Sequence, residues 1–150
     1  MFTVNDMMSS DPITLSSKDK ISDAKCLMDS RRIRHVPIVS ASGKLEGLVT
    51  QRDVLAAQTS SLEKAVGDND PMQAPLSRFL KRSLYTVSPC AGLKEAALYM
   101  QKRKIGCLPV VEDDKLVGII TDSDFVAIAI NLLEIQEETE PMEEEEELVR

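Results

Sequence analysis

The sequence predicts an α+β fold in which a β-α-β-β-α unit of the α/β type occurs twice in tandem. Three pairs of similar stretches predict it: ITLS at 13–16 with YTVS at 85–88, IRHVPIV at 33–39 with IGCLPVV at 105–111, and KLEGLVTQRD at 44–53 with KLVGIITDSD at 115–124. The pairs recur in the same order. Because one small sheet alone would leave a face uncovered, we expect the copies to pack together as a pseudo-twofold pair.

Each copy begins with a short extended piece, ITLS or YTVS, which is followed by a helix. Apolar residues at three- and four-residue spacing predict the helix: Ile21, Ala24, Leu27 and Met28 in the first copy, and Leu93, Ala96, Ala97 and Met100 in the second. Ser16 and Ser88 precede these helices, as polar residues do near helix starts.

Two apolar strands come next, VPIV and LEGLV in the first copy and LPVV and LVGII in the second. The residues between them are rich in Ser, Gly, Asp and Lys, which predicts a hairpin. The first copy is one residue longer in this turn, where an insertion costs little. A second helix then follows, QRDVLAAQ or DSDFVAIAINLL.

Breaker residues and charge divide the chain into four parts: a first repeat at 1–58, a linker at 59–77, a second repeat at 78–133 and an acidic tail at 134–150. The similar stretches MFTVNDMM and LSRFLKRS predict a short helical turn that introduces each copy. Nine of the 25 acidic residues lie in the tail, so we expect it to be a frayed helix end passing into disorder. It is either a solubilising tail or a docking tail.

Composition excludes several classes of function. No apolar run approaches the roughly 20 residues that span a bilayer, and the N-terminus lacks the features of a signal peptide, so we expect a cytoplasmic protein. A near-neutral body with 3% aromatic residues argues against nucleic-acid binding. One histidine and three widely spaced cysteines provide neither a metal site nor catalytic residues, and we expect those cysteines to be reduced and mostly buried.

A Thr-x-x-Asp motif follows each hairpin, Thr50 with Asp53 and Thr121 with Asp124. It matches a helix capping box, in which both side chains satisfy free backbone N–H groups. The same geometry suits a ligand, because a helix start binds phosphate and a carboxylate one turn later can accept from ribose hydroxyls. The glycine before each motif would then let the ligand approach the strand.

These motifs resemble the CBS domain, named after cystathionine β-synthase, in the tandem arrangement called a Bateman module. The resemblance covers about residues 3–133 and rests on all three pairs of stretches. It implies two units packed through their sheets and two clefts related by the pseudo-twofold axis. It also implies a regulatory, non-enzymatic module that binds AMP, ADP, ATP or S-adenosylmethionine and signals to an unknown partner protein.

The resemblance also implies the ligand-binding residues. In the first cleft they are Thr14, Ile33, Arg34, His35, Val36, Pro37, Thr50, Arg52 and Asp53, and in the second Thr86, Ile105, Gly106, Leu108, Pro109, Thr121, Ser123 and Asp124. The threonines before the helices would lie beside the base, and the aspartates would hold the ribose. Thr50, Thr121 and Arg52 would face phosphate.

The first cleft is predicted to be the more basic one, because Arg34, His35 and Arg52 correspond to Gly106, Cys107 and Ser123. We therefore expect diphosphates and triphosphates to favour the first cleft, whereas less charged ligands could use either. Alternatively, Arg34 and Arg52 are solvated or paired with Asp53 and nearby acids.

The helix that begins DSDFVAIAINLL is apolar on nearly every side from Phe125 to Leu133. Since a surface helix needs only one apolar stripe, we expect a further surface to cover it. The family resemblance implies a homodimer there, whereas the linker and the N-terminal turn are the alternative cover. A module that mediates protein interaction with empty clefts is the rival to a ligand sensor.

Overall fold

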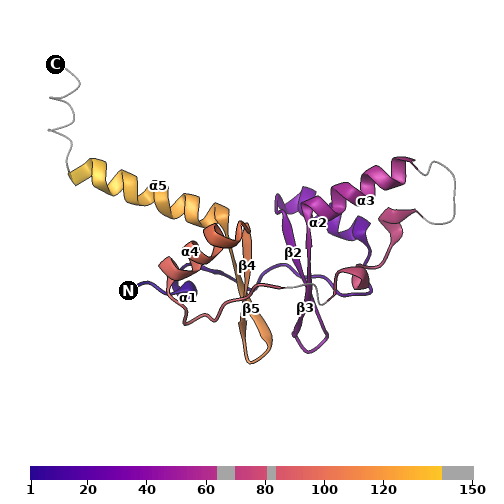
Figure 1. Cartoon of the computed structure of the whole chain (residues 1–150), viewed down its shortest axis with the longest axis horizontal. Coiled ribbons are helices and arrows are strands. Elements are labelled where there is room, and N and C mark those ends of the chain that lie inside the picture. The colour runs from indigo at the N-terminus through magenta and orange to yellow at the C-terminus, as the bar shows by residue number, and fades with distance from the viewer. Residues whose placement is uncertain (64–69, 81–83, 140–150) are drawn as a thin grey trace, which may run out of the picture.

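The computed structural model describes residues 1–63, 70–80 and 84–139 (Figure 1). In chain order its elements are α1 (Val4–Met7), β1 (Ser9–Ser10), α2 (Ile21–Arg31), β2 (His35–Val39), β3 (Leu45–Thr50), α3 (Gln51–Glu63), η1 (Pro71–Gln73), η2 (Leu76–Phe79), α4 (Leu93–Arg103), β4 (Cys107–Glu112), β5 (Lys115–Thr121) and α5 (Asp122–Thr139), where η marks a 3-10 helix. The predicted helix, hairpin and helix are therefore present in both copies.

The strands form two small sheets, β2-β3 and β1-β5-β4, in which all named pairs are antiparallel. The predicted first extended pieces contribute single parallel bridges, Leu15 with Ile38 and Val87 with Val110. Each bridging residue both donates to and accepts from the neighbouring strand, for example Leu15 N to Pro37 O at 3.0 Å. The β-α-β-β-α order is thus confirmed twice.

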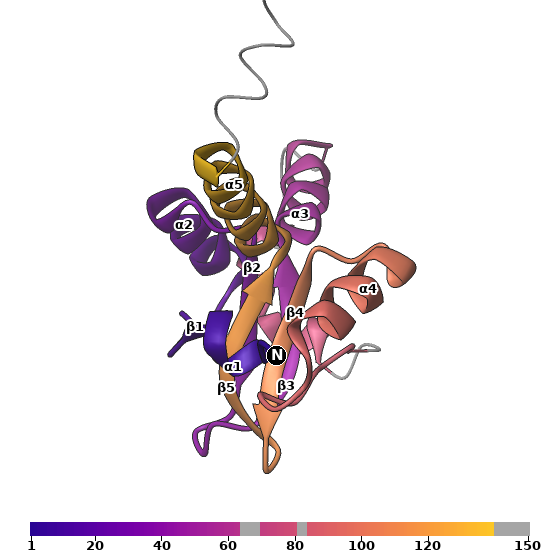
Figure 2. The same cartoon turned by 90° about the vertical axis from the view of Figure 1, so that its left-hand side faces the viewer.

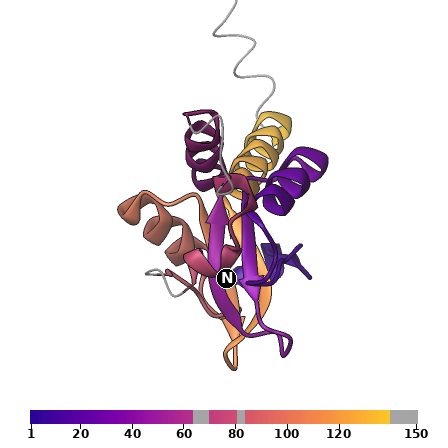
Figure 3. The same ribbon diagram turned by 90° about the vertical axis from the view of Figure 1, so that its right-hand side faces the viewer.

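The two hairpins lie against each other. The backbone N–H of Leu116 donates to the carbonyl of Gly43 at 3.0 Å, which joins the two hairpins directly. Figures 2 and 3 show that the hairpin turns share one end of the molecule, opposite to α2, α3 and α5. The repeats therefore meet along their sheets, and the starts of α3 and α5 lie at the same end.

Every α-helix in the described residues begins with the same hydrogen bond. The carboxylate at the third helical position accepts from the N–H of the residue before the helix, at 2.8–3.1 Å, in the pairs Thr3–Asp6, Lys20–Asp23, Thr50–Asp53, Gly92–Glu95 and Thr121–Asp124. This contact satisfies one backbone N–H and places negative charge where the helix dipole favours it. The two Thr-x-x-Asp motifs therefore form caps of a kind common to the fold.

Each repeat has its own hydrophobic core, but the turns that introduce the repeats are exchanged. Leu76 and Phe79 of η2, which precede the second repeat, are buried in the core of the first. Val4 of α1 is buried in the core of the second. The sequence-based placement of the N-terminal turn with the first repeat therefore does not describe the packing.

The exchanged segments also explain the glycines before the Thr-x-x-Asp motifs. A Cβ at Gly47 would collide with the carbonyl of Phe79, and one at Gly118 would lie 3.0 Å from the carbonyl of Ser9. The proposed reason, a ligand close to the strand, is thus corrected. These glycines make room for the chain segment that crosses from the neighbouring repeat.

Two helices extend beyond the predicted boundaries. Helix α3 runs to Glu63, inside the predicted linker, and α5 runs to Thr139, inside the predicted tail. The rest of the tail, 140–150, and linker residues 64–69 lie outside the described residues. None of the described helices combines the length and hydropathy that crossing a membrane requires.

Candidate functional site

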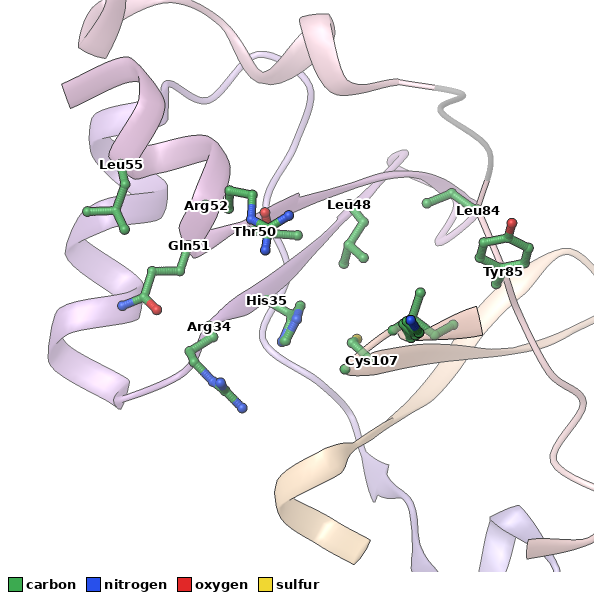
Figure 4. Close-up of a pocket in the computed structure, with 13 residues that line it drawn as sticks. Arg34, His35, Leu48, Thr50, Gln51, Arg52, Leu55, Leu84, Tyr85 and Cys107 are labelled. Atoms are coloured by element: carbon green, nitrogen blue, oxygen red, sulfur yellow. The ribbon is translucent and has the colours of Figure 1, made fainter. Parts of the chain in front are cut away.

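Two clefts lie between the repeats, each at the point where a hairpin passes into a helix. The Thr50 cleft has a volume of about 580 Å³. It is lined by Arg34, His35, Leu48, Thr50, Gln51, Arg52, Leu55, Leu84, Tyr85, Lys104, Ile105, Gly106 and Cys107 (Figure 4). In Figure 4 the side chains of α3 stand on one side of this cleft, and Leu84, Tyr85 and Cys107 stand on the other.

The Thr121 cleft is the counterpart at the start of α5, with a volume of about 370 Å³. Its lining consists of Ser9, Ser10, Asp11, Pro12, Ile13, Arg32, Ile33, Arg34, His35, Pro37, Ile119, Thr121, Ser123 and Asp124. Both volumes fall within the range of about 300–1,000 Å³ that is typical of small-molecule sites.

Each cleft combines the helix start of one repeat with the loop after the first helix of the other. The Thr50 cleft takes residues 104–107 from the second repeat, whereas the Thr121 cleft takes the equivalent residues 32–35 from the first. Arg32 and Lys104 occupy matching left-handed positions, with φ of 54° and 55°. The sequence-based grouping by repeat is therefore corrected: Ile33 lies with Thr121, and Ile105 lies with Thr50.

The two capping aspartates differ in their surroundings. Asp124 lines the Thr121 cleft, and its Oδ2 accepts from the N–H and hydroxyl of Thr121 at 2.8 and 3.2 Å. Asp53 makes the same contacts with Thr50 at 2.9 and 3.0 Å but lines a separate hollow beside η1 and η2. Within the described residues, Oδ1 of Asp124 accepts no hydrogen bond, so that atom is available to a ligand in the cleft.

Several predicted binding residues lie outside both clefts. Val36 and Leu108 are fully buried in the cores, and Pro109 is buried on the same strand as Leu108. Thr14 and Thr86 line neither cleft; instead the preceding residues do, Ile13 in the Thr121 cleft and Tyr85 in the Thr50 cleft. The buried side chains of Val36, Leu108 and Pro109 line neither cleft, and the assignment of all five residues as ligand-binding stays a prediction.

The clefts differ in charge. The Thr50 cleft is lined by Arg34, Arg52 and Lys104 and by no carboxylate among the described residues. The Thr121 cleft balances Arg32 and Arg34 against Asp11 and Asp124. The predicted difference in charge between the two clefts is therefore present in their linings, although Lys104 contributes to it from the other repeat.

An ion pair crosses between the repeats at the boundary of the two clefts. The Nη2 of Arg34 lies 2.8 Å from Oδ1 of Asp122, and the two side chains are 51% and 50% exposed. The alternative interpretation of Arg34, pairing with a nearby acid, therefore describes this structure, with Asp122 as the partner. Figure 4 shows the Arg34 side chain directed away from Thr50 and Arg52.

Burial sets the ionisation of His35 and Cys107 beside the clefts. Burial lowers the pKa of His35, the nearby Arg34 lowers it further, and Asp122 acts in the opposite direction. Burial raises the pKa of the Cys107 thiol to about 12, with a smaller contribution from Asp122. Both groups are therefore neutral near pH 7. Cys26 and Cys90 are exposed, contrary to the expectation that the cysteines are mostly buried.

Sequence reasoning missed the residues that reach each cleft from the other repeat. They include Asp11, Ile13, Arg32, Tyr85 and Lys104, and sequence reasoning also missed Leu48 and Ile119, which come from the same repeat as the helix start of their cleft. The matched positions of Ile13 with Tyr85 and Arg32 with Lys104 in the repeat alignment were the available signal. No group of three potential metal ligands occurs in the parts of the chain that the structure describes.

The comparisons with solved structures agree with this fold. A Vibrio cholerae protein whose assignment to acetoin utilization (AcuB) is provisional is 57% identical, with a TM-score of 0.78 over 94% of this chain and 99% of that one. The CBS domain pair of MJ0100, in complex with 5′-methylthioadenosine and S-adenosyl-L-methionine, is 27% identical with a TM-score of 0.73 over 87% and 98% of the two chains. CBSX2 in complex with AMP is 25% identical with a TM-score of 0.74 over 88% and 98%.

Sequence relatives carry the same region within different proteins. The CBS domain-containing protein YhcV of Bacillus subtilis is 29% identical over 87% of this chain and 86% of its own length. A homoserine O-acetyltransferase of Methanohalophilus mahii is 32% identical over 84% of this chain, which spans only 24% of that enzyme. The CBS domain family model matches residues 4–60 and 76–131. The chain therefore belongs to the CBS domain family and contains the domain as a tandem pair.

Proposed function

We propose that this chain is a regulatory module that binds adenine nucleotides or S-adenosylmethionine in its two clefts and signals in trans to a partner protein. It performs no catalysis of its own in this proposal. The observation that carries it is the pair of matched clefts, each combining a helix start with an apolar wall from the other repeat. The adenosyl ligands of MJ0100 and CBSX2 support it.

In the Thr50 cleft, the adenine base would lie on the apolar wall formed by Leu48, Tyr85 and Ile105. Tyr85 packs edge-on against Tyr99 with ring centroids 5.7 Å apart, and the guanidinium of Arg103 lies 5.4 Å from the Tyr85 centroid. These contacts restrict the ring that a base would meet. The phosphates would lie toward Arg52 and Lys104, so this cleft suits the more highly charged ADP or ATP.

In the Thr121 cleft, Ile13, Ile33 and Ile119 would surround the base. The ribose hydroxyls would donate to Oδ1 of Asp124, while Oδ2 keeps its hydrogen bonds to Thr121. Because Asp11 and Asp124 offset the nearby arginines, this cleft suits a ligand with little net negative charge. S-adenosylmethionine, which carries no net negative charge near pH 7, has that property, and AMP carries less negative charge than ADP or ATP.

Calorimetric titration with AMP, ATP and S-adenosylmethionine tests the proposal. We expect saturable binding, and a ligand at 100 times its dissociation constant should stabilise the fold by about 2.7 kcal/mol. Tyr85→Ala should weaken binding in the Thr50 cleft about tenfold, since stacking of a base on an aromatic ring contributes about 1–3 kcal/mol. The exposed Leu98 provides the control variant Leu98→Ala. If none of the three ligands gives a heat of binding or stabilises the fold, the proposal is wrong.

The second candidate function is a homodimerisation or protein-interaction module whose clefts stay empty. Val126, Ile130 and Leu133 form a stripe along α5, and each is at least 50% exposed. The N-terminal segment covers only part of the helix. Phe2 and Met7 line a hollow with Phe125 and Ile128, whereas the stripe stays exposed. We propose a homodimer that covers this stripe. Sedimentation should show a dimer that Ile130→Glu converts to a monomer; a wild-type monomer would contradict it.

A further inference from the structure

Arg34 lies at the boundary of the two clefts and lines both of them. Its guanidinium makes an ion pair with Asp122 of the other repeat at 2.8 Å. Asp122 stands between Thr121 and Ser123, which both line the Thr121 cleft. Asp122 itself is not among the lining residues of either cleft, so it would act on a ligand through its charge and not by contact.

The two repeats do not provide this pair twice. Gly106 occupies the position equivalent to Arg34, and Gln51 occupies the position equivalent to Asp122. A Cβ at residue 106 would lie 3.0 Å from Oδ2 of Asp122, so the glycine leaves room for that carboxylate. Among the described residues, the two clefts thus share one guanidinium, and a matching one from the second repeat is absent.

The backbone at both positions is held in place. The N–H of Gln51 donates to the carbonyl of Arg34 at 2.8 Å, and the N–H of Asp122 donates to the carbonyl of Gly106 at 3.0 Å. A ligand can therefore redirect the Arg34 side chain without moving the strand. Because the paired side chains are half-exposed, separating them costs little free energy.

We infer that Arg34 couples the two clefts negatively. A phosphate in the Thr50 cleft draws the guanidinium away from Asp122, which leaves that carboxylate uncompensated beside the Thr121 cleft. A second phosphate-bearing ligand then meets an unscreened negative charge at the start of α5. The inference rests on the proposed function, since it requires adenosine ligands that carry phosphate.

Comparing AMP with adenosine isolates this effect, because the two differ only in the phosphate. Titration of the wild type with AMP should show a second site that is weaker than the first. Asp122→Asn should strengthen the second AMP site about two- to fivefold, the range expected for an exposed ion pair. Adenosine binding should stay unchanged, because adenosine has no charge for Asp122 to repel.

Two further variants distinguish the effect of the Arg34–Asp122 ion pair from a general effect of removing negative charge. Glu112→Gln removes one exposed carboxylate at the far end of β4 and should leave both AMP sites unaltered. Arg34→Gln should weaken AMP in both clefts. It should also abolish the coupling, because Asp122 is then uncompensated whether or not the Thr50 cleft is occupied. Raising the salt concentration should reduce the gain from Asp122→Asn.

The outcomes distinguish the coupling from the proposed function. If the wild type binds AMP and Asp122→Asn has no larger effect than Glu112→Gln, the coupling is wrong while the proposed function stands. A single AMP site that remains single in Asp122→Asn contradicts the coupling in the same way. If the wild type binds neither AMP nor adenosine, the proposed function fails, and the coupling fails with it.

Discussion

The backbone N–H of Val4 donates to the carbonyl of Ala91 at 2.8 Å, which ties the N-terminal turn to the second repeat. Val4 is fully buried there, among residues more than 85 positions away in the chain. The first residues of the chain thus complete the core of the second repeat.

Replacing Val4 by alanine should therefore destabilise the second repeat. Two methyl groups leave a packed core, and at about 0.8 kcal/mol each the loss should be about 1.5–2 kcal/mol. Urea unfolding would measure it, and the exposed Leu98→Ala provides the control. A Val4→Ala protein as stable as the control would mean that the turn does not pack against the second repeat.

Alanine at Gly47 should cost more than alanine at Gly118. The new Cβ at residue 47 meets the backbone carbonyl of Phe79, whereas at residue 118 the nearest atom belongs to the flexible side chain of Met8. Overpacking of this kind costs about 1–3 kcal/mol, and a side chain yields more easily than a backbone. Thermal unfolding of both variants would measure the order, and the reverse order would contradict the packing of η2.

The two capping aspartates should respond differently to substitution by asparagine. Asp124→Asn should weaken ligand binding in the Thr121 cleft about tenfold, because Asp124 lines that cleft and an amide accepts fewer hydrogen bonds than a carboxylate. Asp53→Asn should affect stability more than binding, because Asp53 lines a different hollow. Parallel titration and unfolding of both variants would show it. Equal losses of binding would argue that a ligand reaches Asp53 as well.

His35 should titrate below the pKa of about 6.5 found in unfolded chains, because burial and Arg34 disfavour its charged form. Below that pH the unfolded chain binds more protons than the folded chain, so stability should fall as the pH drops through 6.5 toward the folded pKa. Above that window His35 should contribute no pH dependence. Since the chain has one histidine, NMR would follow its imidazole without ambiguity.

Arg34→Gln should raise the pKa of His35, because it removes the repulsion and leaves the attraction of Asp122. His35→Gln should flatten the loss of stability just below pH 6.5. An unshifted imidazole in the folded wild type would place His35 in contact with solvent.

Cys107 should resist alkylation in the folded protein. Burial raises the pKa of its thiol to about 12, so almost no thiolate is present near pH 8, and the side chain is covered. Mass spectrometry after iodoacetamide treatment should show two adducts, on Cys26 and Cys90, and a third only in denaturant. Rapid modification of Cys107 in the native protein would indicate that its strand opens.

The repeated motifs predicted the hairpins because their pattern is local. The apolar runs around Pro37 and Pro109, and the Thr-x-x-Asp motifs that follow at Thr50 and Thr121, define strands and a helix start without reference to the other repeat. The capping interpretation of Asp53 and Asp124 was equally local, and the structure contains it.

Partners across the repeat boundary could not be predicted in this way. Nothing in the sequence near Val4 indicates that Val4 packs with Met100 and Ile120, because both repeats have similar hydrophobic cores. For the same reason, the sequence analysis grouped Ile33 with Thr50, whereas Ile33 lines the Thr121 cleft, and it did not identify Tyr85. The acidic tail was predicted to be a frayed helix end passing into disorder, and α5 is helical through Glu134 and Glu137 to Thr139, whereas residues 140–150 lie outside the described residues.

Because the turns that introduce the repeats are exchanged, the two hydrophobic cores become complete at different times during synthesis. Once residue 79 has left the ribosome, the first core has all its members, since Leu76 and Phe79 are the last to arrive. The second core must wait for Ile120, so the N-terminal turn remains without its partner while more than a hundred residues are made. Nascent chains halted between the repeats should therefore contain a folded first repeat and an unpacked N-terminal turn that a protease can cleave.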